Sequence, residues 1–240
     1  MTIKEKGICI YLLPFAGGGA SDMNPLRSKL EKYYNTNCIE LPGRGRRWRE
    51  SFIISIEEAV DDICLQIKDD NHIVIVGHSL GAYLGFMVAC RLSLLSSVSY
   101  IALSNFAPLA RNKLLDNISL LSSPTYIREI VGDRGVLDQL KSYGDEVYFL
   151  ALNVLKNDLL LSDSFLRYKQ KPKMIYDIHF IYGRDEEYTK EDISKWQLST
   201  NSLLFVYSVQ GGHFFPQEYP EQVASIICSI LAPGVRIVVA

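Results

Sequence analysis

A serine at position 79 lies in the strongest chemical motif of the chain. Residues 73–81 have the sequence Ile-Val-Ile-Val-Gly-His-Ser-Leu-Gly, and a helical pattern follows over residues 82–92. A Gly-x-Ser-x-Gly turn alone occurs by chance in many proteins, but between a buried strand and a helix it is typical of a nucleophile. The glycines allow a tight turn that holds a strained, exposed serine. We therefore predict Ser79 as a nucleophile, beside the positive end of the following helix.

A histidine must take the proton of the serine hydroxyl, because that hydroxyl is otherwise a poor nucleophile. After a serine presented in this way, the partners follow in the order acid and then histidine. Two histidines lie beyond Ser79. His179 falls inside an apolar strand-like run, where a structural histidine is the ordinary interpretation. His213 follows the last predicted strand in Gly-Gly-His-Phe-Phe, and such sheets place their sites at the carboxyl ends of strands. We predict His213 as the base rather than a plain turn residue.

The acid that orients the histidine should follow the preceding strand. Residues 181–188 have the sequence Ile-Tyr-Gly-Arg-Asp-Glu-Glu-Tyr, which places three carboxylates in a row. Asp185 comes first and is our choice for the group that accepts the Nδ1–H of His213 and stabilises the imidazolium. Glu186 is a competitor, because the length of the loop decides which side chain reaches the histidine.

A glycine-rich loop follows the first predicted strand, where residues 12–20 are Leu-Leu-Pro-Phe-Ala-Gly-Gly-Gly-Ala. It lacks the Gly-Lys-Ser/Thr ending of a nucleotide-binding loop and the Gly-x-Gly-x-x-Gly spacing of a dinucleotide site. Beside a serine nucleophile its better use is an oxyanion hole, formed by the backbone N–H groups of Ala16 and Leu80. The loss of one such donor typically costs about 10²–10³ in rate. We therefore predict a functional loop.

Short apolar runs rich in β-branched residues alternate with helical patterns along the chain. The runs cover residues 7–13, 38–41, 72–76, 99–104, 177–182 and 202–209. Short, continuous runs of this kind indicate buried parallel strands. Between them lie amphipathic stretches such as residues 217–231, which repeat apolar side chains on one helical face. The alternation predicts the α/β class with a mostly parallel, doubly wound sheet, in a single domain over residues 1–240.

One long interval breaks this alternation. No strand is predicted from residue 105 to about residue 173, and residues 145–161 are apolar on nearly every face of a helix. Such a helix must be covered on several sides. One interpretation is a helix sandwiched in the core. The favoured interpretation is a helical lid, inserted over about residues 107–172, because long inserts tend to be functional. Such a lid would form an apolar wall of an acyl-binding site.

Together these segments resemble one family. Leu-Pro-Phe-Ala-Gly-Gly-Gly at 13–19, Leu-Pro-Gly-Arg-Gly-Arg-Arg at 41–47, Gly-His-Ser-Leu-Gly at 77–81 and Gly-His-Phe at 212–214 are similar, in order and spacing, to motifs of the type II thioesterases of nonribosomal peptide and polyketide synthesis. The resemblance spans nearly the whole chain and implies the α/β-hydrolase fold. The family's acid is usually followed by proline, whereas Asp185 precedes two glutamates, so this sequence departs from the family pattern at the acid.

The resemblance implies a reaction and a partner. We expect hydrolysis of acyl or aminoacyl thioesters from the phosphopantetheine arm of acyl or peptidyl carrier proteins, through an acyl-Ser79 intermediate, with no metal and no other cofactor. The role would be editing or release of an intermediate. Phe15 is a candidate substrate contact. The cluster Arg44, Arg46, Arg47 and Arg49 either balances nearby carboxylates on a solvated loop or contacts the carrier, since the arginine fork suits phosphate and carboxylate groups.

Composition narrows the class further. A formal net charge of -2 and a pI near 6.1 give no global reason to bind nucleic acid or an anionic membrane. The five cysteines include no Cys-x-x-Cys pair and are predicted as buried thiols. No run approaches the length of a membrane span, and the first residues lack the apolar region of a signal peptide. We expect a cytoplasmic protein that is a monomer.

Two alternatives stay open. A small-molecule esterase or lipase would use the same triad on oxygen esters. A catalytically idle module that only binds acyl carrier proteins belongs to a different class, and the intact elbow, base and glycine loop argue against it.

Overall fold

The computed structural model describes residues 7–68, 71–94, 96–131, 141–142 and 144–232. Its centre is a six-stranded sheet in the order β2-β1-β3-β4-β5-β6, and every pairing in it is parallel. The strands are β1 (Ile8–Leu13), β2 (Asn35–Cys38), β3 (His72–His78), β4 (Ser97–Leu103), β5 (Ile178–Gly183) and β6 (Leu204–Val209). The predicted parallel, doubly wound sheet is confirmed.

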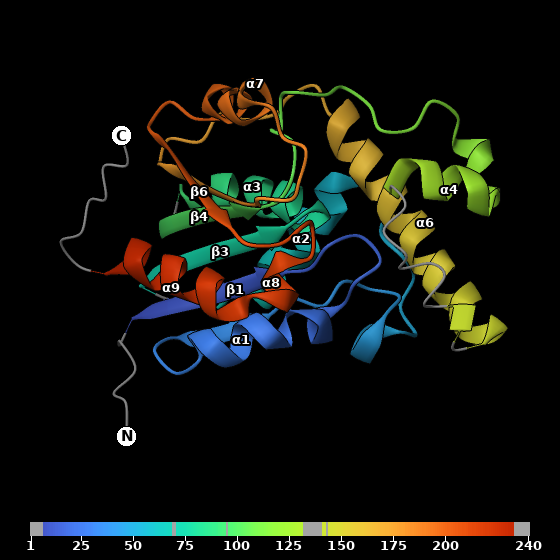
Figure 1. Cartoon of the computed structure of the whole chain (residues 1–240), viewed down its shortest axis with the longest axis horizontal. Helices are drawn as coiled ribbons and strands as arrows, with labels where there is room; N and C mark the ends of the chain where they lie inside the picture. The colour runs from blue at the N-terminus through green and yellow to red at the C-terminus, as the bar shows by residue number, and fades with distance from the viewer. Residues whose placement is uncertain (1–6, 69–70, 95, 132–140, 143, 233–240) are drawn as a thin grey trace.

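Both faces of the sheet are covered by helices, as parallel sheets require. The main helices are α1 (Asn24–Leu30), α2 (Ile56–Gln66), α3 (Leu80–Leu92), α4 (Pro124–Val131), α6 (Asp145–Arg167), α7 (Lys190–Ser194), α8 (Phe215–Glu218) and α9 (Pro220–Leu231). Short 3-10 turns occupy Ala20–Met23, Gly45–Arg47, Ile118–Ser122 and Lys195–Ser199. Helices α1, α8 and α9 lie on one side, and α2 and α3 lie on the other (Figure 1).

Alternating side chains of the central strands build the two cores. Tyr11 and Ile75 point to the layer of α2, α3 and the end of α6, whereas Leu12 and Val76 point to the layer of α1 and α9. All four are almost completely buried. This period of two fixes which strand residues reach each helix layer.

Strand β2 lies three residues earlier than the predicted run at 38–41. Its residues Asn-Thr-Asn-Cys are mostly polar, since β2 is an edge strand that pairs only with β1. Ile39 and Leu41, which suggested the strand, are buried beyond its end. Ile39 still donates its N–H to the Leu12 carbonyl oxygen of β1 at 2.9 Å, so the pairing extends just past the end of β2.

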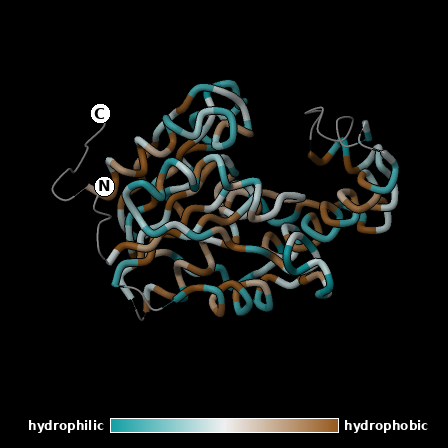
Figure 2. The backbone as a smooth tube through the Cα atoms, turned by 90° about the horizontal axis from the view of Figure 1, so that it is seen from below, coloured by the Kyte–Doolittle hydropathy of each residue, from teal (hydrophilic) through white to brown (hydrophobic). Residues whose placement is uncertain are grey.

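The interval after β4 holds helices and no strand among its described residues. Helices α4 and α6 stand together at one end of the molecule, toward which the carboxyl ends of the strands point (Figure 1). Hydrophobic and hydrophilic residues alternate along this helical block, which projects from the body (Figure 2). Its inner side chains form a small core of their own: Leu115, Leu121, Ile127, Tyr148, Leu152, Leu155 and Leu159. Phe149 and Leu150 are exposed, so α6 is covered on fewer sides than its sequence predicts.

Candidate active site

Ser79 occupies the sharp turn between β3 and α3. Its backbone has φ 55° and ψ −115°, a conformation that is costly for a residue with a side chain and that persists only where the surroundings enforce it. The glycines on either side are required sterically. A Cβ on Gly77 would lie 2.0 Å from the Gly81 carbonyl oxygen, and a Cβ on Gly81 would lie 2.3 Å from that of Leu13. The predicted elbow is present.

Neighbouring strands fix the backbone of Ser79. Its N–H donates to the Leu103 carbonyl oxygen at 3.0 Å. Its own carbonyl oxygen accepts from Nδ2 of Asn105 at 2.6 Å, and Nε1 of Trp196 donates to the Asn105 carbonyl oxygen at 3.2 Å. Sequence reasoning missed Asn105. Its position two residues after β4, at the carboxyl edge of the sheet, was the available signal.

Glu186, and not Asp185, contacts the histidine. Oε1 of Glu186 lies 2.8 Å from Nδ1 of His213, and both side chains are nearly buried. Asp185 is exposed, and its N–H donates to the Gly211 carbonyl oxygen at 3.1 Å. The choice of Asp185 as the orienting acid is therefore wrong. The Glu186 N–H donates to the Gly183 carbonyl oxygen at 3.1 Å and closes a turn over residues 183–186. Because of this turn, the side chain of Glu186, one residue after Asp185, points toward His213.

Two groups hold the Glu186 carboxylate besides the base. Ser104, fully buried and with φ 42°, donates its hydroxyl to Oε2, and the Gly183 N–H donates to the same oxygen at 3.1 Å. Burial opposes ionisation, but the hydrogen bonds from His213 and Ser104, the His213 charge and the Gly183 N–H together outweigh it and lower the pKa of Glu186 below its ordinary value. The carboxylate is thus kept ionised.

Aromatic rings surround His213. The ring of His78, the residue before the nucleophile, lies 5.0 Å from that of His213, and its Nε2 is 2.8 Å from the His213 carbonyl oxygen. Phe15 packs edge-on against His78 and Phe214, at 5.3 and 5.1 Å between ring centroids. Phe15, the candidate substrate contact, therefore lies beside the candidate base.

The start of the glycine loop packs against the turn of Ser79, since a Cβ on Gly81 would lie 2.3 Å from the Leu13 carbonyl oxygen and 2.7 Å from that of Pro14. Its turn is closed by the Gly18 N–H on the Phe15 carbonyl oxygen at 3.0 Å, and Ala16 packs against both the sheet core and the core of the helical block. In the part of the chain that the structure describes, no hydrogen bond engages the N–H of Ala16 or of Leu80. The two predicted oxyanion donors therefore have no partner within the described chain.

The arginine cluster divides into three environments. Arg44 is buried, and its guanidinium makes two bonds of 2.6 Å to the carboxylate of Asp158 on α6. Arg47 makes bidentate pairs with Asp62 and Glu50. Both guanidinium groups are paired within the chain, so neither presents a free fork to a carrier in this structure. Arg46 is exposed and keeps that prediction.

His179 is a strand-face histidine, as predicted. It stacks on Phe205 with 5.0 Å between ring centroids, and its Nδ1 lies 3.2 Å from the Tyr207 hydroxyl. Burial lowers the pKa of His179 to about 4, although Asp177 acts in the opposite sense. These contacts join His179 to strand β6 and not to Ser79, Glu186 or His213.

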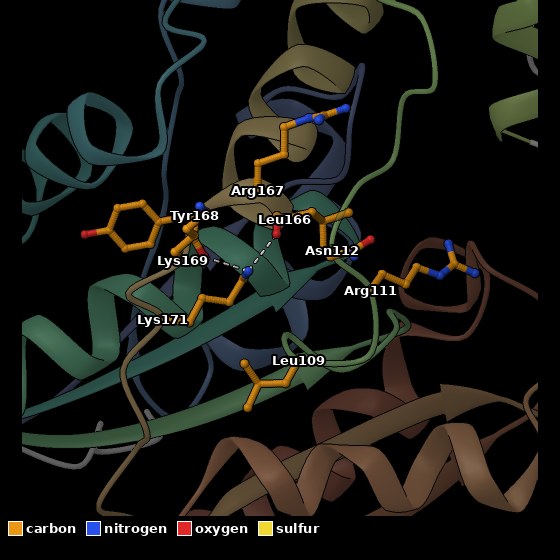
Figure 3. A pocket seen from close by; sticks show the side chains of 8 residues that line it. All are labelled: Leu109, Arg111, Asn112, Leu166, Arg167, Tyr168, Lys169 and Lys171. Atoms are coloured by element: carbon orange, nitrogen blue, oxygen red, sulfur yellow. Dashed lines mark hydrogen bonds between the residues drawn. The ribbon is translucent and has the colours of Figure 1, made fainter.

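A cleft of about 550 Å³ lies between the segment after β4 and the end of α6. Figure 3 shows its lining, in which residues 166–169 lie at the end of α6 and the Arg111 side chain extends away from Lys171. Four of its eight lining residues are cationic and none is acidic. The Arg111 guanidinium lies 3.6 Å above the ring of Phe106. The Lys171 ammonium donates to the carbonyl oxygens of Leu166 and Tyr168, at 2.7 and 2.8 Å.

No helix among the described residues is long and apolar enough to cross a membrane. The described chain also contains no group of three or more His, Cys, Asp or Glu side chains that could hold a metal ion. Its five cysteines are free thiols. Cys9 is buried as predicted, whereas the other four are only partly buried. Burial raises the pKa of Cys38 to about 11 and that of Cys90 to about 12.

Comparison with known proteins agrees with this geometry. The model of the thioesterase domain family matches residues 9–231, so the chain belongs to the thioesterase domain family. Thioesterase PikA5 of Streptomyces venezuelae is 24% identical over 98% of this chain and 86% of its own length. The gramicidin S biosynthesis protein GrsT of Aneurinibacillus migulanus is 25% identical over 94% and 91% of the two chains. The family resemblance of the four motifs is thereby confirmed.

Solved structures share the fold. The type II thioesterase BorB from the borrelidin biosynthetic cluster superposes with a TM-score of 0.76, at 24% identity over 95% of this chain and 94% of its own. ClbQ from the colibactin pathway gives a TM-score of 0.77 at 21% identity, over 92% and 95% of the two chains. The α/β-hydrolase fold is confirmed. ClbQ has the slightly higher TM-score and BorB the higher identity, so the comparison singles out no pathway.

Proposed function

We propose that this thioesterase hydrolyses acyl or aminoacyl thioesters with Ser79 as nucleophile, His213 as base and Glu186 as the orienting acid. The observation that carries the proposal is the 2.8 Å contact between Glu186 and Nδ1 of His213, in a site where Ser79 is partly buried in a strained turn. An Nδ1–H that donates to a carboxylate leaves Nε2 as the proton acceptor.

The reaction takes two displacements. In the first, Nε2 of His213 takes the hydroxyl proton of Ser79 while Oγ forms a bond to the thioester carbonyl carbon, and the N–H groups of Ala16 and Leu80 stabilise the oxyanion. The carbon–sulfur bond then breaks, and the sulfur leaves with the proton from His213. In the second displacement, His213 activates water, which attacks the acyl-Ser79 ester and releases the acid. Glu186 stabilises the imidazolium in both steps.

The acyl group would be delivered by a carrier protein. PikA5, GrsT and BorB are by name thioesterases or proteins of biosynthetic pathways, and a carrier-bound acyl or peptidyl thioester is the substrate that such a pathway would supply. Helices α4 and α6 would act as a lid over about residues 107–172, whose apolar core reaches the glycine loop through Ala16. Two roles stay open for the enzyme, the editing of misloaded carriers and the release of an intermediate. A cytoplasmic location and a monomeric state also stay predictions.

The basic cleft is our choice for the phosphate of the carrier's phosphopantetheine arm. On one side of the cleft, Arg111 contacts the ring of Phe106. The neighbour of Phe106, Asn105, donates to the Ser79 carbonyl oxygen. On the other side, Leu166 follows Phe165, whose ring stacks on that of Tyr83 with 4.3 Å between centroids. Tyr83 lies one helical turn after Ser79. Arg111 and Lys169 supply the positive charge that would attract an anion, because Arg167 pairs with Asp163 and the Lys171 ammonium donates to two backbone carbonyl oxygens. A phosphate bound there would send the thioester end toward Ser79.

A substrate comparison tests the reaction. The enzyme should hydrolyse an acylated carrier and a short acyl thioester faster than the matching p-nitrophenyl ester. A strong preference for the oxygen ester would favour the esterase alternative. Failure of a fluorophosphonate to label Ser79, with no turnover of either substrate, would favour the idle binding module.

Charge reversal tests the phosphate cleft. Arg111→Glu and Lys169→Glu should raise the KM for the acylated carrier several-fold at low salt, and leave the KM for a short thioester without phosphate unchanged. Lys173→Glu, an exposed lysine outside the lining, is the control. The difference should shrink at high salt, because screening weakens exposed charge contacts. Equal effects on both substrates would contradict docking at this cleft.

A further inference from the structure

Asp158 is a carboxylate in the middle of an apolar helix face. It lies on α6 at 1% exposure, one turn from Leu155 and beside Leu159, which belong to the core of the helical block. An isolated charge at such a position is very unfavourable. Arg44 supplies the counter-charge through two bonds of 2.6 Å. Burial raises the pKa of Asp158, and the Arg44 guanidinium and the Gly17 N–H oppose that rise.

The remaining bonds of this pair go to the glycine loop. Oδ2 of Asp158 accepts the Gly17 N–H at 2.7 Å, and Nη1 of Arg44 donates to the Gly18 carbonyl oxygen at 2.9 Å. Gly17 has φ +85°, and Leu155 of α6 lies against it. The next peptide group toward the N-terminus carries the Ala16 N–H. Arg44 and Asp158 therefore hydrogen-bond the backbone immediately after Ala16, the predicted oxyanion donor.

A second buried acid holds the far end of the same loop. Oε1 of Glu40, a residue at 5% exposure, accepts the Ala20 N–H at 2.9 Å. Its carboxylate fills the space that a Cβ on Gly45 would need, with Oε2 only 2.1 Å from that position. Gly45 has φ +51°, so the turn after Arg44 requires glycine for two reasons. The loop that presents Arg44 is shaped around this contact.

We infer that Arg44 and Asp158 are positioning residues, which set the Ala16 N–H of the oxyanion hole and tie its geometry to the placement of α6. The inference rests on the proposed function. A buried ion pair is often no more stabilising than apolar residues of the same volume, so stability alone does not explain why α6 holds a carboxylate here. The geometry of the pair does explain it. Asp158 holds the Gly17 N–H and Arg44 holds the Gly18 carbonyl oxygen, while the bidentate bond between the two side chains ties both peptide groups to α6.

The pair also predicts how catalysis depends on α6. A displacement of α6 would move Asp158, and with it the Gly17 N–H that this carboxylate accepts. The oxyanion hole would then be complete only when α6 is docked. The substrate's acyl chain, if it lies along α6, would favour the docked position and so the catalytically competent loop.

A double variant separates positioning from folding. Arg44→Met with Asp158→Leu removes both charges together, so neither is left buried alone. We expect a folded protein whose kcat for a short acyl thioester falls at least about tenfold, toward the 10²–10³ loss of a whole oxyanion donor, with little change in KM. The affinity for an alkyl trifluoromethyl ketone, which forms a tetrahedral adduct with Ser79, should fall in parallel.

Asp62→Asn is the matched control, since Asp62 makes a bidentate pair of the same geometry with Arg47, and Arg47 contacts the backbone carbonyl oxygen of Glu40 rather than the peptide groups of Gly17 and Gly18. It should lower the melting temperature and leave kcat unchanged. Arg44→Lys, which keeps the charge but loses the fork, provides a second reading if the double variant does not fold, and should also lower kcat. Wild-type kcat and ketone affinity in either folded variant would overturn the inference. Failure of the wild-type enzyme on thioesters, with activity on p-nitrophenyl esters, would instead refute the proposed substrate, and the same variants could then be measured on esters.

Discussion

Oε1 of Glu186 lies 2.8 Å from Nδ1 of His213, while the adjacent Asp185 is exposed. The two carboxylates differ because the turn after β5 closes between Gly183 and Glu186. Ser104, at the end of the neighbouring strand β4, then meets the carboxylate that points inward. The acid is thus set by two strand ends and one turn.

Replacing the two carboxylates separately tests this arrangement. Glu186→Gln should lower kcat by orders of magnitude, about 10⁴ where such an amide fixes the wrong histidine tautomer. Asp185→Asn should leave kcat within a few-fold of wild type. Steady-state kinetics on a short acyl thioester, with melting temperatures for both variants, makes the measurement. A dead Asp185→Asn beside an active Glu186→Gln would show that this turn is wrongly placed.

Ser104 should matter through Glu186 alone. Ser104→Ala removes a hydrogen bond to a charged group, which is typically worth about 1.5–3 kcal/mol, so kcat should fall roughly 10- to 100-fold. The KM should change little, because Ser104 is buried behind the acid. Ser199→Ala is the control: Ser199 is also a fully buried serine, and its hydroxyl has no hydrogen-bond partner among the described residues. Equal losses in the two variants would point to a general packing effect.

His179 should govern stability at mildly acidic pH and not catalysis. Its pKa is about 4 in the folded chain, lowered by burial from an ordinary value of 6.5. Between these values the unfolded chain binds the extra proton, so the free energy of unfolding should fall as pH drops from about 6.5 to 4, by at most about 3 kcal/mol. His179→Phe, which can stack on Phe205, should flatten that dependence in denaturant titrations. A slope unchanged by the substitution, or a lost kcat, would contradict this role.

Arg46 and Arg47 should behave differently although they are adjacent. Arg47→Ala breaks pairs with Asp62 and Glu50, and should lower the melting temperature while affecting carrier-bound and free thioesters alike. Arg46→Ala should leave stability unchanged, because its side chain is exposed. If Arg46 touches the carrier, its loss raises the KM only for the carrier-bound substrate, and less so at high salt. An unchanged KM would leave the basic cleft as the sole docking site that we propose.

Local patterns were sufficient for much of this molecule. The strand, elbow and helix around Ser79 follow from a buried apolar run and two obligatory glycines, and His213 follows from its place after the last strand. The parallel sheet could be predicted because its inner strands are apolar on both faces. Edge strand β2, which is mostly polar, could not be located in this way.

What the sequence did not reveal depends on contacts between distant segments. The partner of Arg44 lies 114 residues away, on α6, so composition could not separate a buried pair from a free basic patch. Asn105 and Ser104 became visible only when the sheet placed β4 beside β3 and β5. Glu186 was preferred over Asp185 by the closure of a four-residue turn, which depends on backbone geometry and not on residue type.

The most direct measurement is the mass of the intact protein, and of its peptides, after rapid quenching with an acyl thioester. We expect an adduct of the acyl mass on the peptide that contains Ser79. The adduct should be absent in Ser79→Ala, and it should accumulate in Glu186→Gln if that substitution slows deacylation more than acylation. A fluorophosphonate should label the same residue in the wild-type enzyme. Turnover retained by a folded Ser79→Ala variant, or an adduct on another residue, would contradict the account.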